Sequence, residues 1–334
     1  MPNAKLLTVV VAAYNCATTL NRIFEHIAAC KHLDQLEVII VNDGSKDDTS
    51  EVAHRYADMY PSLVRVIDKE NGGHGSALSA GFKAAGGRYC RPLDGDDWLD
   101  EHGLDALLEH LVKCDADMVV SDVKILNLDT DTAKRVPSPL PADCVCGVKD
   151  IIPIEPMPGY HATIFSTKIL RQIPNLDRHC FYVDNEYNTY PLFYVNKLIY
   201  YPEIVYVHTV GKEEQSTSVR SLIRNIDNLR TVFFSLMQYA VQHKGKTDAV
   251  AVTYRFAGSL LGTFTNVTFV DDAKKGKNEL HAMYMVVRNR YPEFYRSNYI
   301  KPLGRVYRTL HLHGYWFIRL LVHIKNKGNA RIVW

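Results

Sequence analysis

The chain has 334 residues, 47% of them hydrophobic, and a formal net charge of +2. This length and composition exclude an intrinsically disordered protein and predict one large domain or a domain with an appendage. The charge is uneven, because residues 301–334 contain seven Lys or Arg and no Asp or Glu. The rest of the chain is mildly acidic, which argues against a broad nucleic-acid-binding surface, and we expect no nucleic acid partner.

The cysteines and the N-terminal residues indicate the cellular compartment in which we expect the protein. Seven cysteines are an odd number, and MPNAKLLTVVVAAYN lacks the basic region and long apolar run of a secretion signal. Residues 314–324 (GYWFIRLLVHI) are too short to cross a bilayer. We therefore expect a cytoplasmic protein with reduced thiols and no membrane span.

The first third of the chain alternates apolar runs with helical patterns, which is typical of strand–helix–strand units. Strands are predicted at residues 6–12, 37–41, 63–67, 88–93, 117–126 and 161–166, with helices between the earlier ones. The proline-rich residues 136–147 predict a surface loop. After about residue 221 the pattern is helical and rich in aromatic and basic residues.

Small and polar residues follow three of these strands, at residues 12–15 (AAYN), 42–45 (NDGS) and 94–97 (DGDD). Ligands of such sheets bind beyond the carboxyl ends of the strands, so these segments predict one binding site. The turn NGGHG, at residues 71–75, precedes a predicted helix. Its glycines allow close backbone approach, and a helix start offers free N–H groups to a phosphorylated ligand.

The stretch RPLDGDDWLD, at residues 91–100, contains four aspartates: Asp94, Asp96, Asp97 and Asp100. Crowded carboxylates repel one another unless a cation or water compensates them. Mg²⁺ and Mn²⁺ are typically held by one or two carboxylates together with substrate phosphates, so the motif predicts a divalent-cation site. The alternative is that Asp96, Asp97 and Asp100 only cap the following helix.

Taken in order, VVVAAYN, VIIVNDGSKDDT, ENGGHGSALSAG and PLDGDDWLD resemble the inverting family 2 glycosyltransferases of bacterial cell-envelope and exopolysaccharide synthesis. The resemblance covers about residues 6–112. It implies the α/β GT-A fold, a mostly parallel central sheet flanked by helices, with a helical C-terminal region. The implied domains are a catalytic domain at 1–218, with a nucleotide-sugar half to about 125 and an acceptor half from 126, and a helical region at 219–334.

The same resemblance implies a metal-dependent enzyme that transfers a hexosyl or N-acetylhexosaminyl group to a hydroxyl. The donor would be a nucleotide-sugar, and the resemblance favours a UDP-sugar. The acceptor would be a glycan, lipid-linked or protein-linked, and the cofactor Mn²⁺ or Mg²⁺. Gly73, in the glycine turn, is expected at the donor. The other carried-over positions are Ala12 and Tyr14 at the uridine, Asp43 at the base, Asp94 at the ribose side and Asp96 at the metal.

Inverting transfer requires a base that removes the proton of the acceptor hydroxyl. The family's base is the aspartate of a Glu-Asp pair, and Asp184 is its match in HCFYVDNEYNTYPL, although Val183 replaces the glutamate. Glu186 is the second candidate. The alternative is that both are solvated acids favoured by the dipole of the following helix.

Residues 206–221 (YVHTVGKEEQSTSVRS) resemble the family's segment that closes over the diphosphate. His208 is a candidate metal ligand, and Gln215 and Ser216 are candidate donors to phosphate or acceptor. The alternative is a structural histidine at a strand end.

The basic, aromatic C-terminus suits peripheral contact with the inner face of the membrane, or equally an amphipathic helix docked on the catalytic domain or a partner. A catalytically silent GT-A scaffold for another glycosyltransferase is the rival function. The chain would act as a homo-oligomer, with a partner glycosyltransferase, or alone.

Overall fold

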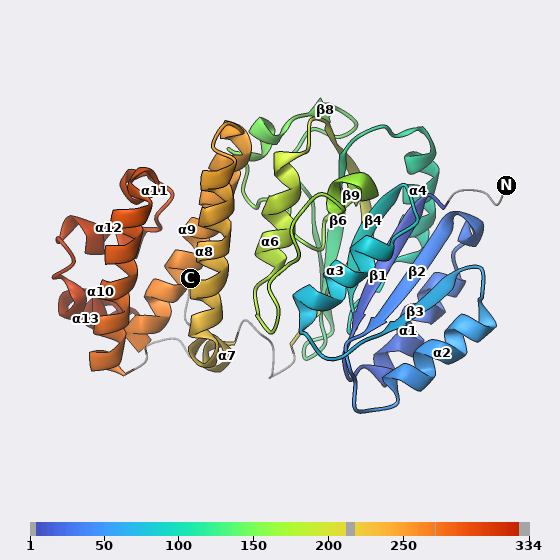
Figure 1. Cartoon of the computed structure of the whole chain (residues 1–334), viewed down its shortest axis with the longest axis horizontal. Coiled ribbons are helices and arrows are strands. Elements are labelled where there is room, and N and C mark those ends of the chain that lie inside the picture. The colour runs from blue at the N-terminus through green and yellow to red at the C-terminus, as the bar shows by residue number, and fades with distance from the viewer. Residues whose placement is uncertain (1–4, 212–217, 271, 327–334) are drawn as a thin grey trace. The chain divides into compact units, whose positions relative to one another are not determined.

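The computed structural model describes residues 5–211, 218–270 and 272–326 (Figure 1). The chain divides into two compact units, Met1–Lys212 and Glu213–Trp334, which we describe separately. The boundary predicted from the sequence, after residue 218, lies a few residues beyond the boundary in the structure, after Lys212.

The first unit is built on one mixed sheet with the strand order β3-β2-β1-β4-β9-β6-β10-β5. Strands β3, β2, β1 and β4 run parallel, and β9 lies antiparallel between β4 and β6. The strands are β1 Leu7–Ala13, β2 Leu36–Asn42, β3 Val64–Asp68, β4 Tyr89–Asp94, β5 Trp98–Leu99, β6 Met118–Asn127, β7 Thr132–Val136, β8 Val145–Cys146, β9 Thr163–Ser166 and β10 Leu198–Val210. The six predicted strands are confirmed, with ends that differ by at most two residues.

Side chains alternate between the two faces of the sheet along each strand, and both faces of β1 are mainly apolar. Helices therefore cover both faces. Val9 and Val11 of β1 belong to the core beneath α1, α2 and α4. Val10 points to the opposite face, where a Cβ on Gly81 of α3 would lie 2.1 Å from it. The helices of this unit are α1 Ala17–Ala28, α2 Thr49–Met59, α3 His74–Ala84, α4 Glu101–Lys113, α5 Thr167–Leu170 and α6 Asp184–Thr189, with short 3₁₀ helices at Leu33–Gln35, Val148–Ile151 and Tyr190–Phe193.

The strand register brings the predicted binding segments to one edge. Ala13 at the end of β1 is paired with Asn42 at the end of β2, and Ala12 is paired with Asp94 at the end of β4. The residues that follow these strands therefore leave the sheet side by side, as the sequence predicts.

The described part of the second unit is helical, which confirms the predicted helical C-terminal region. Helices α8, α10, α12 and α13 pack against the largely buried α9. The helices are α7 Val219–Arg224, α8 Ile226–Gln242, α9 Thr247–Val270, α10 Ala273–Arg290, α11 Pro292–Arg296, α12 Pro302–Thr309 and α13 Tyr315–Asn326. Among the described residues, none of the helices combines the length and the hydropathy that a membrane span requires.

Candidate active site

The turn between β4 and β5 gathers three of the four predicted aspartates. One carboxylate oxygen from each of Asp94, Asp96 and Asp97 lies within 4.8 Å of the other two. Asp94 is partly buried, Asp96 is exposed and Asp97 is almost fully buried. Three carboxylates at this separation repel one another, so the turn suits a cation.

Asp97 has a different environment from its neighbours, because its carboxylate accepts four hydrogen bonds. Its Oδ1 accepts from the backbone N of Thr209 at 2.7 Å and from the Thr209 hydroxyl at 3.0 Å. Its Oδ2 accepts from the Tyr206 hydroxyl at 2.9 Å and lies 2.9 Å from Nδ1 of His208. Asp97 therefore joins the acidic turn to β10 and orients His208.

The capping alternative applies to one aspartate of the motif. The Asp100 side chain accepts a hydrogen bond from the backbone N of Gly103 at 2.9 Å and caps α4. Asp97 is engaged by β10 instead, and Asp96 and Asp94 point their carboxylates to the same cluster. The motif thus serves two purposes, a helix cap at its end and a carboxylate cluster at its centre.

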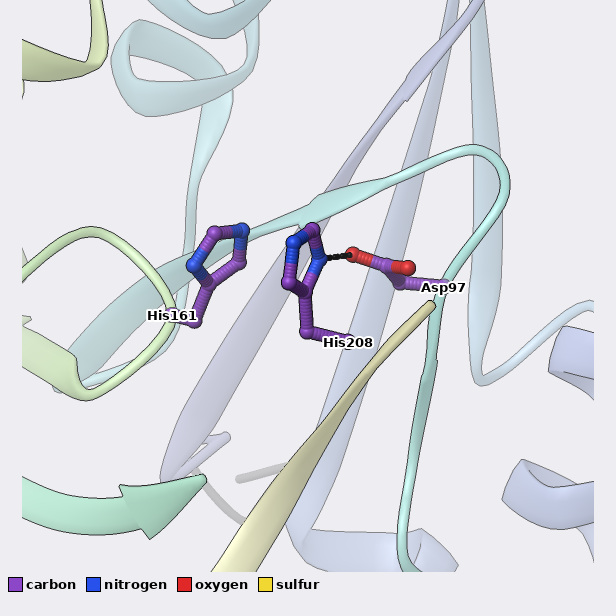
Figure 2. Close-up of side chains that lie close together, drawn as sticks. All are labelled: Asp97, His161 and His208. Atoms are coloured by element: carbon purple, nitrogen blue, oxygen red, sulfur yellow. Dashed lines mark hydrogen bonds and ion pairs between the residues drawn. The ribbon is translucent and has the colours of Figure 1, made fainter. Parts of the chain in front are cut away.

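Two histidines complete the cluster (Figure 2). His208, on β10, and His161, in the loop before β9, stack with ring centroids 4.1 Å apart. Burial lowers the pKa of His208, but the hydrogen bond and charge of Asp97 outweigh it, so the net shift of this pKa is upward. His161 Nε2 lies 3.8 Å from Oδ2 of Asp94. His208 is one of the predicted site residues, whereas His161 was assigned only to a strand.

The buried guanidinium of Arg91 stabilises the residues that surround the carboxylate cluster. Arg91, on β4, is fully buried, and its Nη2 donates to the backbone O of His161 at 2.9 Å. Its guanidinium lies 5.0 Å from the centroid of the Tyr206 ring. Tyr160, next to His161, donates its hydroxyl to Asp94 at 2.9 Å. Arg91 therefore fixes the loop and ring that hold Asp94 and Asp97.

The environment of Asp94 favours its anionic form. Burial opposes the charge, but His161, His74 and the Tyr160 hydroxyl stabilise it, so the pKa of Asp94 is well below its usual range. His74 is the first residue of α3, and its Nε2 lies 3.6 Å from Oδ1 of Asp94. The glycine turn before α3 thus faces the acidic turn.

The shape of the glycine turn depends on Asp43. The buried Asp43 carboxylate accepts from the backbone N of Gly72 at 3.0 Å and of Gly73 at 2.8 Å, and pairs with Lys69 Nζ at 2.5 Å. Gly73 has φ 81°, and a Cβ there would lie 2.8 Å from the backbone N of His179. Asp43 therefore organises the glycine turn.

The other predicted donor residues lie at the same edge. Ala12 is partly buried near the end of β1, and Tyr14 just after it is 48% exposed. Gln215 and Ser216 lie outside the described residues.

The two candidate bases on α6 differ in their environments. Asp184 is partly exposed, and burial, opposed by His161 and His74, raises its pKa. Glu186 is 1% exposed, and its carboxylate accepts from the backbone N of Asp177 at 2.8 Å and from the Tyr190 hydroxyl at 2.9 Å. Because both Glu186 oxygens are engaged in the interior, Asp184 has the more accessible carboxylate of the two.

A pocket of about 160 Å³ adjoins the histidine pair. Its walls are mainly apolar side chains of β6, the end of β7 and the loop before β9, and His161 and His208 line it too. Representative wall residues are Val123, Ile125, Val136, Met157 and Pro158. Part of its wall, residues 156–162, belongs to the acceptor half predicted from residue 126.

Most of the first unit matches a known protein family. Residues 8–173 match the model of the family "Glycosyl transferase family 2". Glycosyltransferase GlyG of Streptococcus pneumoniae is 33% identical over 120 residues, which are 36% of this chain and 39% of that protein. Chondroitin synthase of Pasteurella multocida is 37% identical over 108 residues, 32% of this chain and 11% of that protein. The matched segment thus spans well under half of each of these relatives.

Solved structures share the fold over a longer span. The S. aureus TarS fragment 1–349, in complex with UDP-GlcNAc, has a TM-score of 0.66 and 16% sequence identity, covering 94% of this chain and 90% of that one. The mannosyltransferase PcManGT of Pyrobaculum calidifontis, in complex with GDP-Man and Mn²⁺, has a TM-score of 0.51 and 17% identity, covering 98% and 89%. At these identities the likeness concerns the fold. Residues 8–173 therefore belong to glycosyl transferase family 2, and the chain shares the GT-A fold of the solved structures.

Proposed function

We propose that the chain is a metal-dependent inverting enzyme that transfers a sugar from a UDP-sugar to a hydroxyl of a glycan, lipid-linked or protein-linked acceptor. The observation that supports this best is the meeting of Asp94, Asp96 and the Asp97–His208 pair at one edge of the sheet. Asp184 lies close enough to interact electrostatically with Asp94. The UDP-GlcNAc complex of TarS supports a uridine donor.

The donor atoms fit a divalent cation. Asp96 offers an exposed carboxylate, and His208 is held through Nδ1 by Asp97, an arrangement typical of metal-binding histidines, whose other nitrogen faces the ion. We assign Asp96 and His208 as ligands of Mn²⁺ or Mg²⁺. A bound ion would neutralise the charge that develops on the leaving diphosphate.

The remaining edge residues would bind the nucleotide-sugar. Ala12 and the exposed Tyr14 would line the uridine, Asp43 would contact the base and Asp94 the ribose side. Gly73 allows the backbone of the glycine turn to approach the donor closely. We keep Gln215 and Ser216 as proposed donors to phosphate or acceptor.

Asp184 would act as the base. Its carboxylate takes the proton of the acceptor hydroxyl while that oxygen bonds to the anomeric carbon and the bond to the diphosphate oxygen breaks. The electron pair of the broken bond leaves on UDP, so an α-linked donor gives a β-linked product. A raised pKa makes Asp184 a stronger proton acceptor.

The second unit supports peripheral membrane contact rather than a purely internal role for its last helices. Two exposed aromatic residues of α13, Trp316 at 54% and Phe317 at 58%, lie beside Leu320 at 58%. The basic residues Lys301 and Arg305 are exposed nearby along the chain. Aromatic and basic side chains together suit an anionic lipid surface at the cytoplasmic face.

The test of this function is UDP release from a panel of UDP-sugars by the wild type, by Asp184→Asn and by the control Asp115→Asn. Asp115 is a solvent-exposed carboxylate elsewhere in the unit. We expect Asp184→Asn to retain UDP binding and to lose at least about a hundredfold in turnover, the usual contribution of a general base. Equal turnover in all three proteins would refute the role of Asp184, and no turnover in any would favour the silent scaffold.

A further inference from the structure

His161 is the residue of the cluster that the function proposed above does not use. It comes from the loop between the proline-rich segment and β9, not from the acidic motif or from β10. One ligand atom each of Asp97, His161 and His208 lies within 4.8 Å of the other two. We propose that His161 is a second imidazole ligand of the metal site, and that the site consequently prefers Mn²⁺ to Mg²⁺.

The distances suit shared coordination better than a direct hydrogen bond. His161 Nε2 is 3.8 Å from Asp94 Oδ2, beyond hydrogen-bond length. Two ligands that each lie about 2.1 Å from one ion can be separated by up to about 4.2 Å, and one ligand atom each of His161 and His208 lie within 4.8 Å of each other. Figure 2 shows the rings of His161 and His208 beside each other, and they are stacked with an angle of 26° between their planes. Binding of both imidazoles to one ion would require the His161 side chain to move closer to His208 and to turn its ring.

The backbone around His161 is fixed on both sides. Arg91 is bonded to its carbonyl oxygen at 2.9 Å, and the neighbouring Tyr160 is bonded to Asp94 at 2.9 Å. The ring also meets Tyr206 edge to face, with centroids 4.9 Å apart. These contacts give the His161 ring a defined position beside His208.

The second imidazole decides which metal the site prefers. Mg²⁺ demands oxygen ligands and dehydrates reluctantly, whereas imidazole nitrogen suits transition metals. One histidine already gives the site one ligand of the kind that transition metals prefer. A second histidine moves the balance to Mn²⁺, which accepts both carboxylate and imidazole.

The experiment measures Mn²⁺ binding in the presence of UDP by the loss of the free-ion EPR signal, and Mg²⁺ binding by competition. The proteins are the wild type, His161→Gln, His161→Asp and the control His74→Gln. His74 lies at a similar distance, 3.6 Å, from the other oxygen of Asp94. Unfolding transitions of all four establish that each variant is folded.

We expect His161→Gln to weaken Mn²⁺ binding about tenfold or more, with a much smaller effect on Mg²⁺, so that the Mn²⁺ to Mg²⁺ affinity ratio falls. His161→Asp, which supplies oxygen, should shift the ratio further toward Mg²⁺, and His74→Gln should leave it unchanged. A ratio unaffected by both His161 variants, or lowered by His74→Gln instead, overturns the assignment.

The assignment of His161 depends on the metal site proposed above. Different results of the experiment would contradict the metal site and the role of His161. If the wild type with UDP binds neither ion, the metal-dependent function itself is wrong. If the wild type binds Mn²⁺ and His161→Gln weakens both ions equally, the metal site holds and His161 has only a structural role.

Discussion

Asp97→Asn tests whether the buried carboxylate joins the acidic turn to β10. Each carboxylate oxygen of Asp97 serves two donors, on Tyr206, His208 and Thr209. An asparagine keeps one oxygen and turns an NH₂ group toward two donors, whichever way the amide is oriented. Two hydrogen bonds to a charged acceptor are lost, at about 1.5–3 kcal/mol each, so the free energy of unfolding should fall by about 3–6 kcal/mol.

The same substitution should release His208 from its fixed orientation. Loss of a carboxylate that orients a ligating histidine typically lowers metal affinity about 10- to 100-fold. The assays are denaturant unfolding and Mn²⁺ binding in the presence of UDP. The matched control is Asp100→Asn in the same motif, because Asn caps a helix about as well as Asp does.

The result that refutes this reasoning is a destabilisation by Asp97→Asn of less than about 1 kcal/mol together with unchanged Mn²⁺ affinity. The carboxylate of Asp97 would then be replaceable, and His208 would be oriented by other contacts.

Three further predictions concern the rest of the molecule. Burial raises the pKa of Glu186 from 4.5 to about 8, so the unfolded chain releases a proton that the folded one keeps, and stability falls as pH rises between these values. Glutamine does not titrate, so the unfolding free energy of Glu186→Gln minus that of the wild type should rise by up to about 4 kcal/mol from pH 5 to pH 8. A difference that stays constant over this range contradicts a buried neutral Glu186. Gly73→Ala should lower the free energy of unfolding by about 1–3 kcal/mol, because the positive φ of Gly73 strains any residue with a Cβ. The control Gly245→Ala places its Cβ in open space and should lower it much less. Equal losses for the two variants in urea unfolding would contradict this. Replacing Trp316 and Phe317 by serine should abolish sedimentation with anionic vesicles if α13 contacts lipid, and unchanged sedimentation would exclude that contact.

Much of the donor side could be predicted from the sequence because it depends on local patterns. Apolar runs marked the strands, and parallel pairing of β1 with β2 and β4 brings the residues after them to one edge. Asp94, Asp96 and Gly73 therefore lie where the motifs place them. His208 lies at the same edge, because β10 is hydrogen-bonded to Asp97 of the acidic turn, and its role as a metal ligand stays a prediction.

The residues that the sequence did not reveal depend on tertiary contacts. Arg91 lies in a strand run, and no periodicity indicates that its charge is buried against a tyrosine and a carbonyl oxygen. His161 has no neighbour of metal-binding spacing, so only the fold brings it to His208. The distinct role of Asp97 within four similar aspartates likewise depends on β10, which pairs with β5 directly after Asp97.

The choice between Asp184 and Glu186 shows the same limit. Both are acids two positions apart at a helix start, and sequence alone favours the first only through the resemblance to the family. Packing separates them, because Glu186 is engaged by Asp177 and Tyr190 in the interior.

The most direct test of the central claim is calorimetry of UDP binding, with and without Mn²⁺, on the wild type and on Asp96→Asn. If the acidic turn holds a cation for a diphosphate, Mn²⁺ should tighten UDP binding to the wild type by about tenfold or more, which corresponds to about 1.4 kcal/mol, and should do so little or not at all for the variant. UDP binding that is absent from both proteins, or that Mn²⁺ enhances equally in both, would contradict the account.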